Sequence, residues 1–85
     1  MRTVVFHASA FRDYSEWAAR DPKMLERITR LIAETLRNPF AGIGKPEALK
    51  HELKGCWSRR INDEHRLVYK VTDESLIILA CRYHS

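Results

Sequence analysis

Glu47, His84 and one or both of Arg60 and Arg66 are residues of this 85-residue chain whose types could together perform acid–base chemistry on a phosphate. A carboxylate such as Glu47 can remove a proton, and a histidine such as His84 titrates near neutral pH and can donate one. An arginine binds a phosphate through two parallel hydrogen bonds. This set suits RNA cleavage without a metal, because the 2′-hydroxyl of RNA is itself the nucleophile and the protein must only move protons and stabilise the phosphorane.

A second arginine, Arg60, lies across a polar turn from Arg66. If the turn is of odd length with Asp63 at its centre, the two arginines lie directly opposite each other in a hairpin. Like charges in that position are destabilising, so an unpartnered pair suggests a site for an absent phosphate. Another register, or neutralisation by neighbouring acids, is the alternative. The acids concerned are Glu47, Asp63 and Glu64.

Each proton-transfer candidate also has a plainer interpretation. Glu47 lies beside Lys45 and Lys50 in a segment rich in glycine and proline, so it could simply form a salt bridge. His84 is a single histidine near the end of the sequence, where chains commonly fray. The apolar run Ile77–Ala80 carries the chain almost to His84, but taken alone the histidine is still better explained as part of a frayed end.

The net charge of +4 favours an anionic partner. Cations recur from Lys45 onward with Trp57, Tyr69 and Tyr83 among them. Cations that meet phosphates beside rings that stack on bases suit single-stranded nucleic acid. A solvated sheet edge would give a similar pattern, so composition leaves both interpretations open.

Other classes of site find no support in the sequence. Cys56 and Cys81 lack CxxC spacing and are expected to be buried thiols, and the four histidines lack metal-site spacing. We therefore expect no metal and no cofactor. No stretch is long and apolar enough for a membrane span, and the first residues are too short an apolar run for a signal peptide, so a cytoplasmic location is expected.

The first half of the chain predicts one strand and two helices. Residues 3–6, three β-branched residues and one phenylalanine, read as a strand, and Ser9 could cap a helix with a core stripe. That stripe comprises Phe11, Tyr14, Trp17 and Ala18. Asp21 is expected to cap a second helix with Pro22 in its first turn, and Asn38–Pro39 should end it.

The second half predicts a β-meander that would carry the chemistry. Residues 39–46 read as a loop, and residues 47–50 as a helical turn or the approach to a strand. Four strands then follow, at residues 51–53, 56–61, 65–71 and 75 to about 83. Alternation along the last strand would place Arg82 and His84 on one face.

The predicted order β-α-α-β-β-β-β indicates an α+β fold in one domain, residues 1–85. The helical hairpin would cover one face of an antiparallel sheet and leave the other face free for the arginines.

Several runs of this sequence resemble one family closely. They are "GKPEALKHEL", "WSRRI", "EHRLVY" and "ACRYH", and the likeness extends back through "RNPFAGIGKPE" and the helical region. The chain resembles the YoeB/Txe toxins of the RelE/ParE superfamily. The resemblance implies a microbial-ribonuclease-like fold and a ribosome-dependent endoribonuclease that cuts messenger RNA in the A site.

The resemblance also implies residue roles. Glu47 would be the general base, Arg66 the residue that stabilises the transition state, and His84 the general acid. Residues expected to contact RNA are Lys50, Arg59, Arg60, Tyr83 and Ser85. The family commonly has an aromatic residue directly after the histidine, where this chain has Ser85. Serine cannot stack on a base, so substrate orientation is the property most open to change.

The partners implied by the resemblance are a YefM-like antitoxin, the bacterial ribosome with its messenger RNA, and operator DNA through the antitoxin complex. A homodimer is also possible. The alternative function is a member of the superfamily that acts by binding alone, as a ParE-like gyrase inhibitor or a nucleic-acid-binding corepressor.

Overall fold

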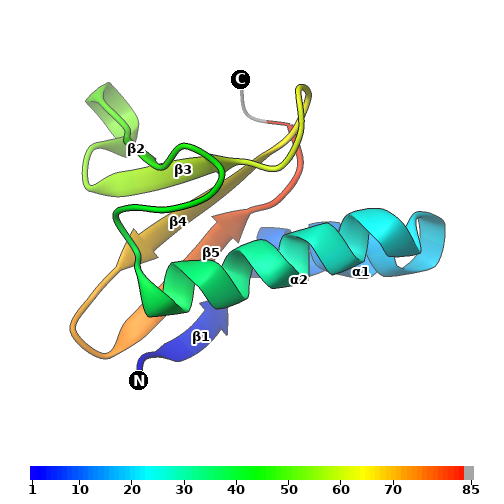
Figure 1. Ribbon diagram of the computed structural model, residues 1–85, viewed down its shortest axis with the longest axis horizontal. Helices are drawn as coiled ribbons and strands as arrows, with labels where there is room; N and C mark the ends of the chain where they lie inside the picture. Colours follow the sequence, from blue (N-terminus) through cyan, green and yellow to red (C-terminus); the bar gives the residue numbers. More distant parts are fainter. Residues whose placement is uncertain (84–85) are drawn as a thin grey trace.

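A helical hairpin covers one face of a five-stranded sheet in the computed structural model, which describes residues 1–83 (Figure 1). The first elements are β1 (Thr3–Phe6), α1 (Ala8–Arg20) and α2 (Pro22–Arg37). Next come β2 (Glu47–Ala48), the 3₁₀ helix η1 (His51–Leu53) and β3 (Cys56–Arg60). The last strands are β4 (Arg66–Val71) and β5 (Ser75–Ala80).

The strands lie in the order β1-β5-β4-β3-β2. The α+β fold and the predicted element order are confirmed, but the sheet is mixed because β1 pairs with β5 in parallel. The other neighbours pair antiparallel. Hairpin turns dictate antiparallel pairing within the meander, whereas β1 reaches β5 only after both helices, so its direction could not be inferred from local turns.

The second helix begins and ends where the sequence predicts. The Asp21 carboxylate accepts a hydrogen bond from the Met24 amide at 3.2 Å, and Pro22 occupies the first turn. The helix ends at Arg37, one residue before Asn38 and Pro39. The first helix differs from the prediction: its N-cap is His7, and the Ser9 hydroxyl instead donates to the Leu79 carbonyl.

The core lies between the hairpin and the sheet. The buried apolar residues of α2 are Ile28, Leu31 and Ile32, and they face the core strands. On α1 the predicted stripe is only partly right, because Phe11 is 61% exposed and Ala18 is exposed too. Ala10 is buried instead, and with Tyr14 and Trp17 it follows the i, i+4, i+7 spacing of one helix face.

Residues 51–53 form a 3₁₀ turn, not the predicted strand. The Leu53 amide donates to the Lys50 carbonyl at 3.2 Å, and Leu53 is 42% exposed. The strand in this region is β2, which lies earlier in the chain, at Glu47–Ala48. Of the two predictions for residues 47–50, extended chain is therefore closer to the structure than a helical turn. Because Ala48 pairs with Trp57, the chain must reverse direction between them.

The last strand ends at Ala80, not near Tyr83 as predicted. A bulge breaks the alternation, because Val68 pairs with Ala80 and Tyr69 with Ile78. Cys81 consequently lies in the main core below the helices, while Ala80 packs in a smaller cluster with Val68. The strand alternation from which a common face of Arg82 and His84 was predicted ends at Ala80, and His84 lies outside the described residues.

Both cysteines are free and buried, as predicted. Burial, reinforced by the negative charge of Asp13, raises the pKa of the Cys81 thiol to about 12. We expect native Cys81 to resist iodoacetamide at pH 8, because its thiolate fraction there is on the order of one in ten thousand. Mass spectrometry after timed labelling measures this. Labelling in urea serves as the control, and equally rapid labelling of the native protein would contradict the assignment.

Candidate active site

Glu47 and Arg66 meet on the face of the sheet that the helices leave uncovered. Pairing of β2 with β3 places Glu47 beside Ser58, and the next pairing places Ser58 beside Val68. The Arg66 guanidinium Nη1 donates to Ser58 Oγ at 3.2 Å and lies 3.7 Å from the Glu47 carboxylate. The Glu47 side chain is 61% exposed, so this carboxylate is accessible to a ligand.

Arg60 and Arg66 lie directly opposite each other, as the odd-length turn predicted. The turn is fixed by Asn62, whose side-chain oxygen accepts from the amides of Glu64 and His65 at 2.9 and 2.7 Å. The two arginines differ in their partners. Arg66 is near Glu47, whereas no carboxylate among residues 1–83 lies within 4.0 Å of the Arg60 side-chain nitrogens. Within the described part of the chain, Arg60 is therefore the member of the opposed pair that has no carboxylate partner.

Ser58 is a site residue that sequence reasoning missed. It is buried, and its hydroxyl is the hydrogen-bond partner that orients the Arg66 guanidinium. Strand alternation offered a signal, because residues 58 and 60 must share a face.

The same alternation shows that Arg59 was wrongly predicted to contact RNA. Arg59 is 0% exposed and points to the opposite face of the sheet, away from Arg60. Its guanidinium donates to the carbonyls of Ile43 at 3.1 Å and Ala41 at 2.9 Å, and to that of Asn38. Arg59 thus fastens the loop between α2 and β2, which leads directly to Glu47.

Tyr69 supports the same loop from β4. Its hydroxyl accepts from Arg59 Nε at 3.2 Å and donates to the Pro39 carbonyl at 2.8 Å. Burial raises the pKa of Tyr69, and this effect exceeds the opposing influence of the Arg59 cation. The phenol therefore keeps its proton, which the bond to Pro39 requires.

Lys50 lies three residues after Glu47 as the N-cap of η1, and its side chain is exposed. Tyr83 is half exposed, and its carbonyl accepts from the Arg66 amide at 3.0 Å. The chain is therefore held beside the candidate site up to Tyr83. The predictions for His84 and Ser85 lie outside the described residues.

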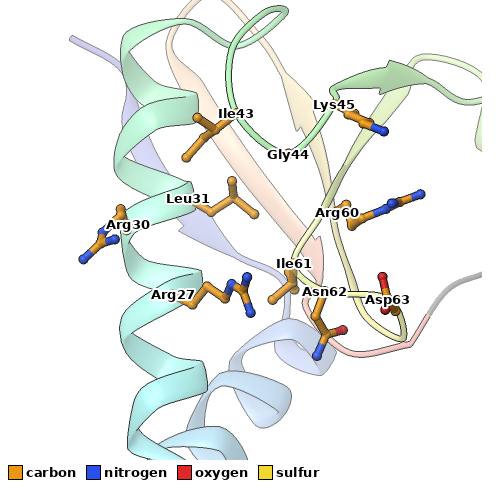
Figure 2. A pocket seen from close by; sticks show the side chains of 10 residues that line it. All are labelled: Arg27, Arg30, Leu31, Ile43, Gly44, Lys45, Arg60, Ile61, Asn62 and Asp63. Carbon is orange, nitrogen blue, oxygen red and sulfur yellow. The ribbon is translucent and has the colours of Figure 1, made fainter.

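A cavity of about 400 Å³ lies beside the site, between α2 and the β3–β4 hairpin. Arg27, Arg30, Lys45 and Arg60 are among its lining residues. Figure 2 shows that these cations do not converge: Arg30 points outward from α2, while Lys45 and Arg60 point to the far side of the loop. Among residues 1–83, no group of three histidine, cysteine or acidic side chains could hold a metal ion.

Comparison with known proteins identifies the family of this chain. Residues 6–85 match the family described as YoeB-like toxin of bacterial type II toxin–antitoxin systems. The chain belongs to the YoeB toxin family. A YoeB toxin of Mycobacterium bovis is 56% identical over 84 residues, which cover 99% of each chain. No helix among the described residues of this YoeB-family chain is long and apolar enough to cross a membrane.

Solved YoeB structures share the whole fold. The YoeB/ParE toxin from Agrobacterium tumefaciens is 45% identical, covers 100% of both chains and superimposes with a TM-score of 0.94. YoeB from Staphylococcus aureus is known as a dimer, with 46% identity, a TM-score of 0.92 and coverage of 99% of this chain and 98% of that one. It is also known in a heterotetrameric YoeB–YefM complex, with 45% identity, a TM-score of 0.91 and coverage of 100% and 99%.

The loop that leads to Glu47 requires glycine at residue 44. Gly44 has a φ of +81°, and an added Cβ would lie 3.1 Å from both the Arg59 Cβ and the Arg60 carbonyl oxygen. Gly55 has a similar φ of +95° but open space around it. We expect Gly55→Ala to cost about 1–2 kcal/mol of unfolding free energy from backbone strain alone. Gly44→Ala should cost about 1–3 kcal/mol more from overpacking, measured by urea denaturation; equal losses would contradict this.

Neighbouring arginines offer a matched test of the buried guanidinium. Arg59→Leu should lower the free energy of unfolding by about 3 kcal/mol or more, because three loop carbonyls lose their donor and each unsatisfied group costs about 1–3 kcal/mol. Arg60→Leu, at the exposed next position, should change it by less than about 0.5 kcal/mol. Urea denaturation followed by tryptophan fluorescence gives both values. A small loss for Arg59→Leu would show that the loop does not depend on this side chain.

Proposed function

We propose that this chain is a ribosome-dependent endoribonuclease that cuts messenger RNA in the A site and so inhibits translation. The observation that carries the proposal is the placement of Glu47 and Arg66 together on an accessible sheet face, 3.7 Å apart, beside the segment that leads to His84. Membership of the YoeB family supports the same activity.

In the proposed reaction Glu47 removes the proton of the RNA 2′-hydroxyl, which then attacks the adjacent phosphorus. Arg66 stabilises the negative charge that accumulates on the phosphorane oxygens, and Ser58 holds its guanidinium in place. His84 donates a proton to the departing 5′-oxygen. The products are a 2′,3′-cyclic phosphate and a free 5′-hydroxyl, and no metal takes part.

Other residues are proposed to hold the RNA. Arg60 supports a phosphate contact, because it lies opposite Arg66 with no carboxylate near it among residues 1–83. Lys50 is exposed close to Glu47, and the half-exposed ring of Tyr83 could meet a base. Ser85 stands where the family commonly has an aromatic residue, so we propose a weaker hold on the substrate base at that position.

The partners are proposed by family relationship. The S. aureus complex supports a YefM-like antitoxin as the inhibitor of this chain, and the S. aureus dimer supports self-association. The ribosome with its messenger RNA would be the site of action in the cytoplasm. With its antitoxin the chain would bind operator DNA as a corepressor.

Removal of the proposed proton carriers tests the reaction. On programmed ribosomes, Glu47→Gln and His84→Ala should each slow cleavage by about 10²–10⁴-fold, the usual contribution of a general acid or base. Primer extension locates the cut, and end-group analysis identifies the cyclic phosphate.

Glu74→Gln is the matched control, because this exposed carboxylate lies on the β4–β5 turn, at the far end of the sheet from the β3–β4 turn (Figure 1). It should cleave like the natural protein. Unchanged cutting by both active-site variants would refute the residue roles. No cutting by the natural protein would favour a ParE-like or corepressor role through binding alone.

A further inference from the structure

Residues 81–83, which we call the 81–83 segment, follow the end of β5 but do not hang free. Helix α1 holds the first part. The Cys81 amide donates to the Asp13 carboxylate at 3.3 Å, and the Cys81 carbonyl accepts from the Trp17 indole at 2.9 Å. The Arg82 guanidinium lies 2.6 Å from the Glu16 carboxylate. Three residues of α1 at i, i+3 and i+4, and hence on one helix face, fix where the segment begins.

The start of β4 holds the other end. The Arg66 amide donates to the Tyr83 carbonyl at 3.0 Å, and the Tyr83 amide donates to Nδ1 of the His65 ring at 2.8 Å. Tyr83 has a φ of 57°, a left-handed conformation that is uncommon for a residue with a side chain. Such a conformation persists only where the surroundings impose it, and these two bonds do so.

The His65 ring is itself immobilised. It is 5% exposed and packs edge-on against Trp17, with ring centroids 4.9 Å apart, and against Tyr83 at 4.8 Å. The His65 amide donates to the Asn62 side chain, and its carbonyl accepts from the Ile61 amide at 2.9 Å. The position of Nδ1 is therefore determined by both backbone and packing.

The bond from Tyr83 fixes the protonation state of the ring. A backbone amide can only donate, so Nδ1 of His65 must accept and carries no proton. The neutral ring then has its proton on Nε2, which lies 3.4 Å from the Glu64 carboxylate. A doubly protonated ring would direct an N–H at the N–H of Tyr83, and the bond would be lost.

We propose that His65 is a positioning residue for the site. Its unprotonated Nδ1 fixes the backbone of Tyr83, and so sets the point from which the chain continues to His84. This inference rests on the proposed function, in which His84 is the general acid. His65 does not touch the substrate; it acts through the 81–83 segment.

Two substitutions separate the acceptor from the packing. In His65→Asn the side-chain oxygen can take the place of Nδ1, whereas His65→Leu fills the space without an acceptor. We expect His65→Leu to speed hydrogen exchange of the Tyr83 amide by roughly five- to tenfold, the factor that loss of one hydrogen bond gives. His65→Leu should also lower kcat on programmed ribosomes with little change in KM. His65→Asn should restore both kcat and the slow exchange of the Tyr83 amide.

The ¹⁵N NMR spectrum of the natural protein provides a measurement that needs no variant. At neutral pH it should show His65 with Nδ1 unprotonated and the proton on Nε2. A protonated Nδ1 would overturn the proposal even if His65→Leu fails to fold. Unchanged exchange of the Tyr83 amide in His65→Leu would overturn it as well.

The two proposals can fail separately. If the natural protein does not cut messenger RNA, the proposed function fails, and the exchange and ¹⁵N measurements still decide whether His65 holds Tyr83. If the natural protein cuts and His65→Leu frees Tyr83 with unchanged kcat, the positioning role is overturned and the proposed function stands.

Discussion

The buried guanidinium of Arg59 is the constraint on which the candidate site depends. The loop between α2 and β2 contains neither helix nor strand, and the carbonyls of Asn38, Ala41 and Ile43 lose their Arg59 donor if that side chain is removed. The planar guanidinium donates hydrogen bonds to several of these carbonyls at once. A lysine ammonium lacks the geometry to do so. Glu47 follows this loop, so the position of an exposed carboxylate is decided by a side chain on the other face of the sheet.

Two separate supports therefore converge on one face of the molecule. Arg59 and Tyr69 hold the loop that precedes Glu47, while α1 and His65 hold the segment that leads past Tyr83. Both supports use buried or half-buried groups to fix backbone, and neither needs a ligand to be present. The exposed residues of the candidate site can thus remain polar and accessible, since buried groups on the other side of the backbone make the site rigid.

Much of this could be predicted from the sequence because the signals are local. The cap at Asp21, the stop before Pro39 and the opposed pair Arg60 and Arg66 all follow from neighbours along the chain. The errors came from interactions that local patterns do not carry. A bulge shifted the alternation after Ile78, and the role of Arg59 depended on which face of β3 it occupies. The family resemblance implied RNA contacts for both Arg59 and Arg60. Only the structure shows that Arg59 is buried and Arg60 is exposed.

The place of β5 in the sheet has a consequence for synthesis. This strand lies between β1 and β4, although it is the last of the five to be made. On the ribosome β1 must wait for more than sixty intervening residues before its partner emerges, as its pairing of Thr3 with Ser75 requires. Contacts of such long sequence separation form late, because closing the long loop between the two strands costs conformational entropy before their contacts can stabilise the sheet. A nascent chain therefore cannot complete its sheet early, because β5 takes its place between β1 and β4 only after the last strand has been made.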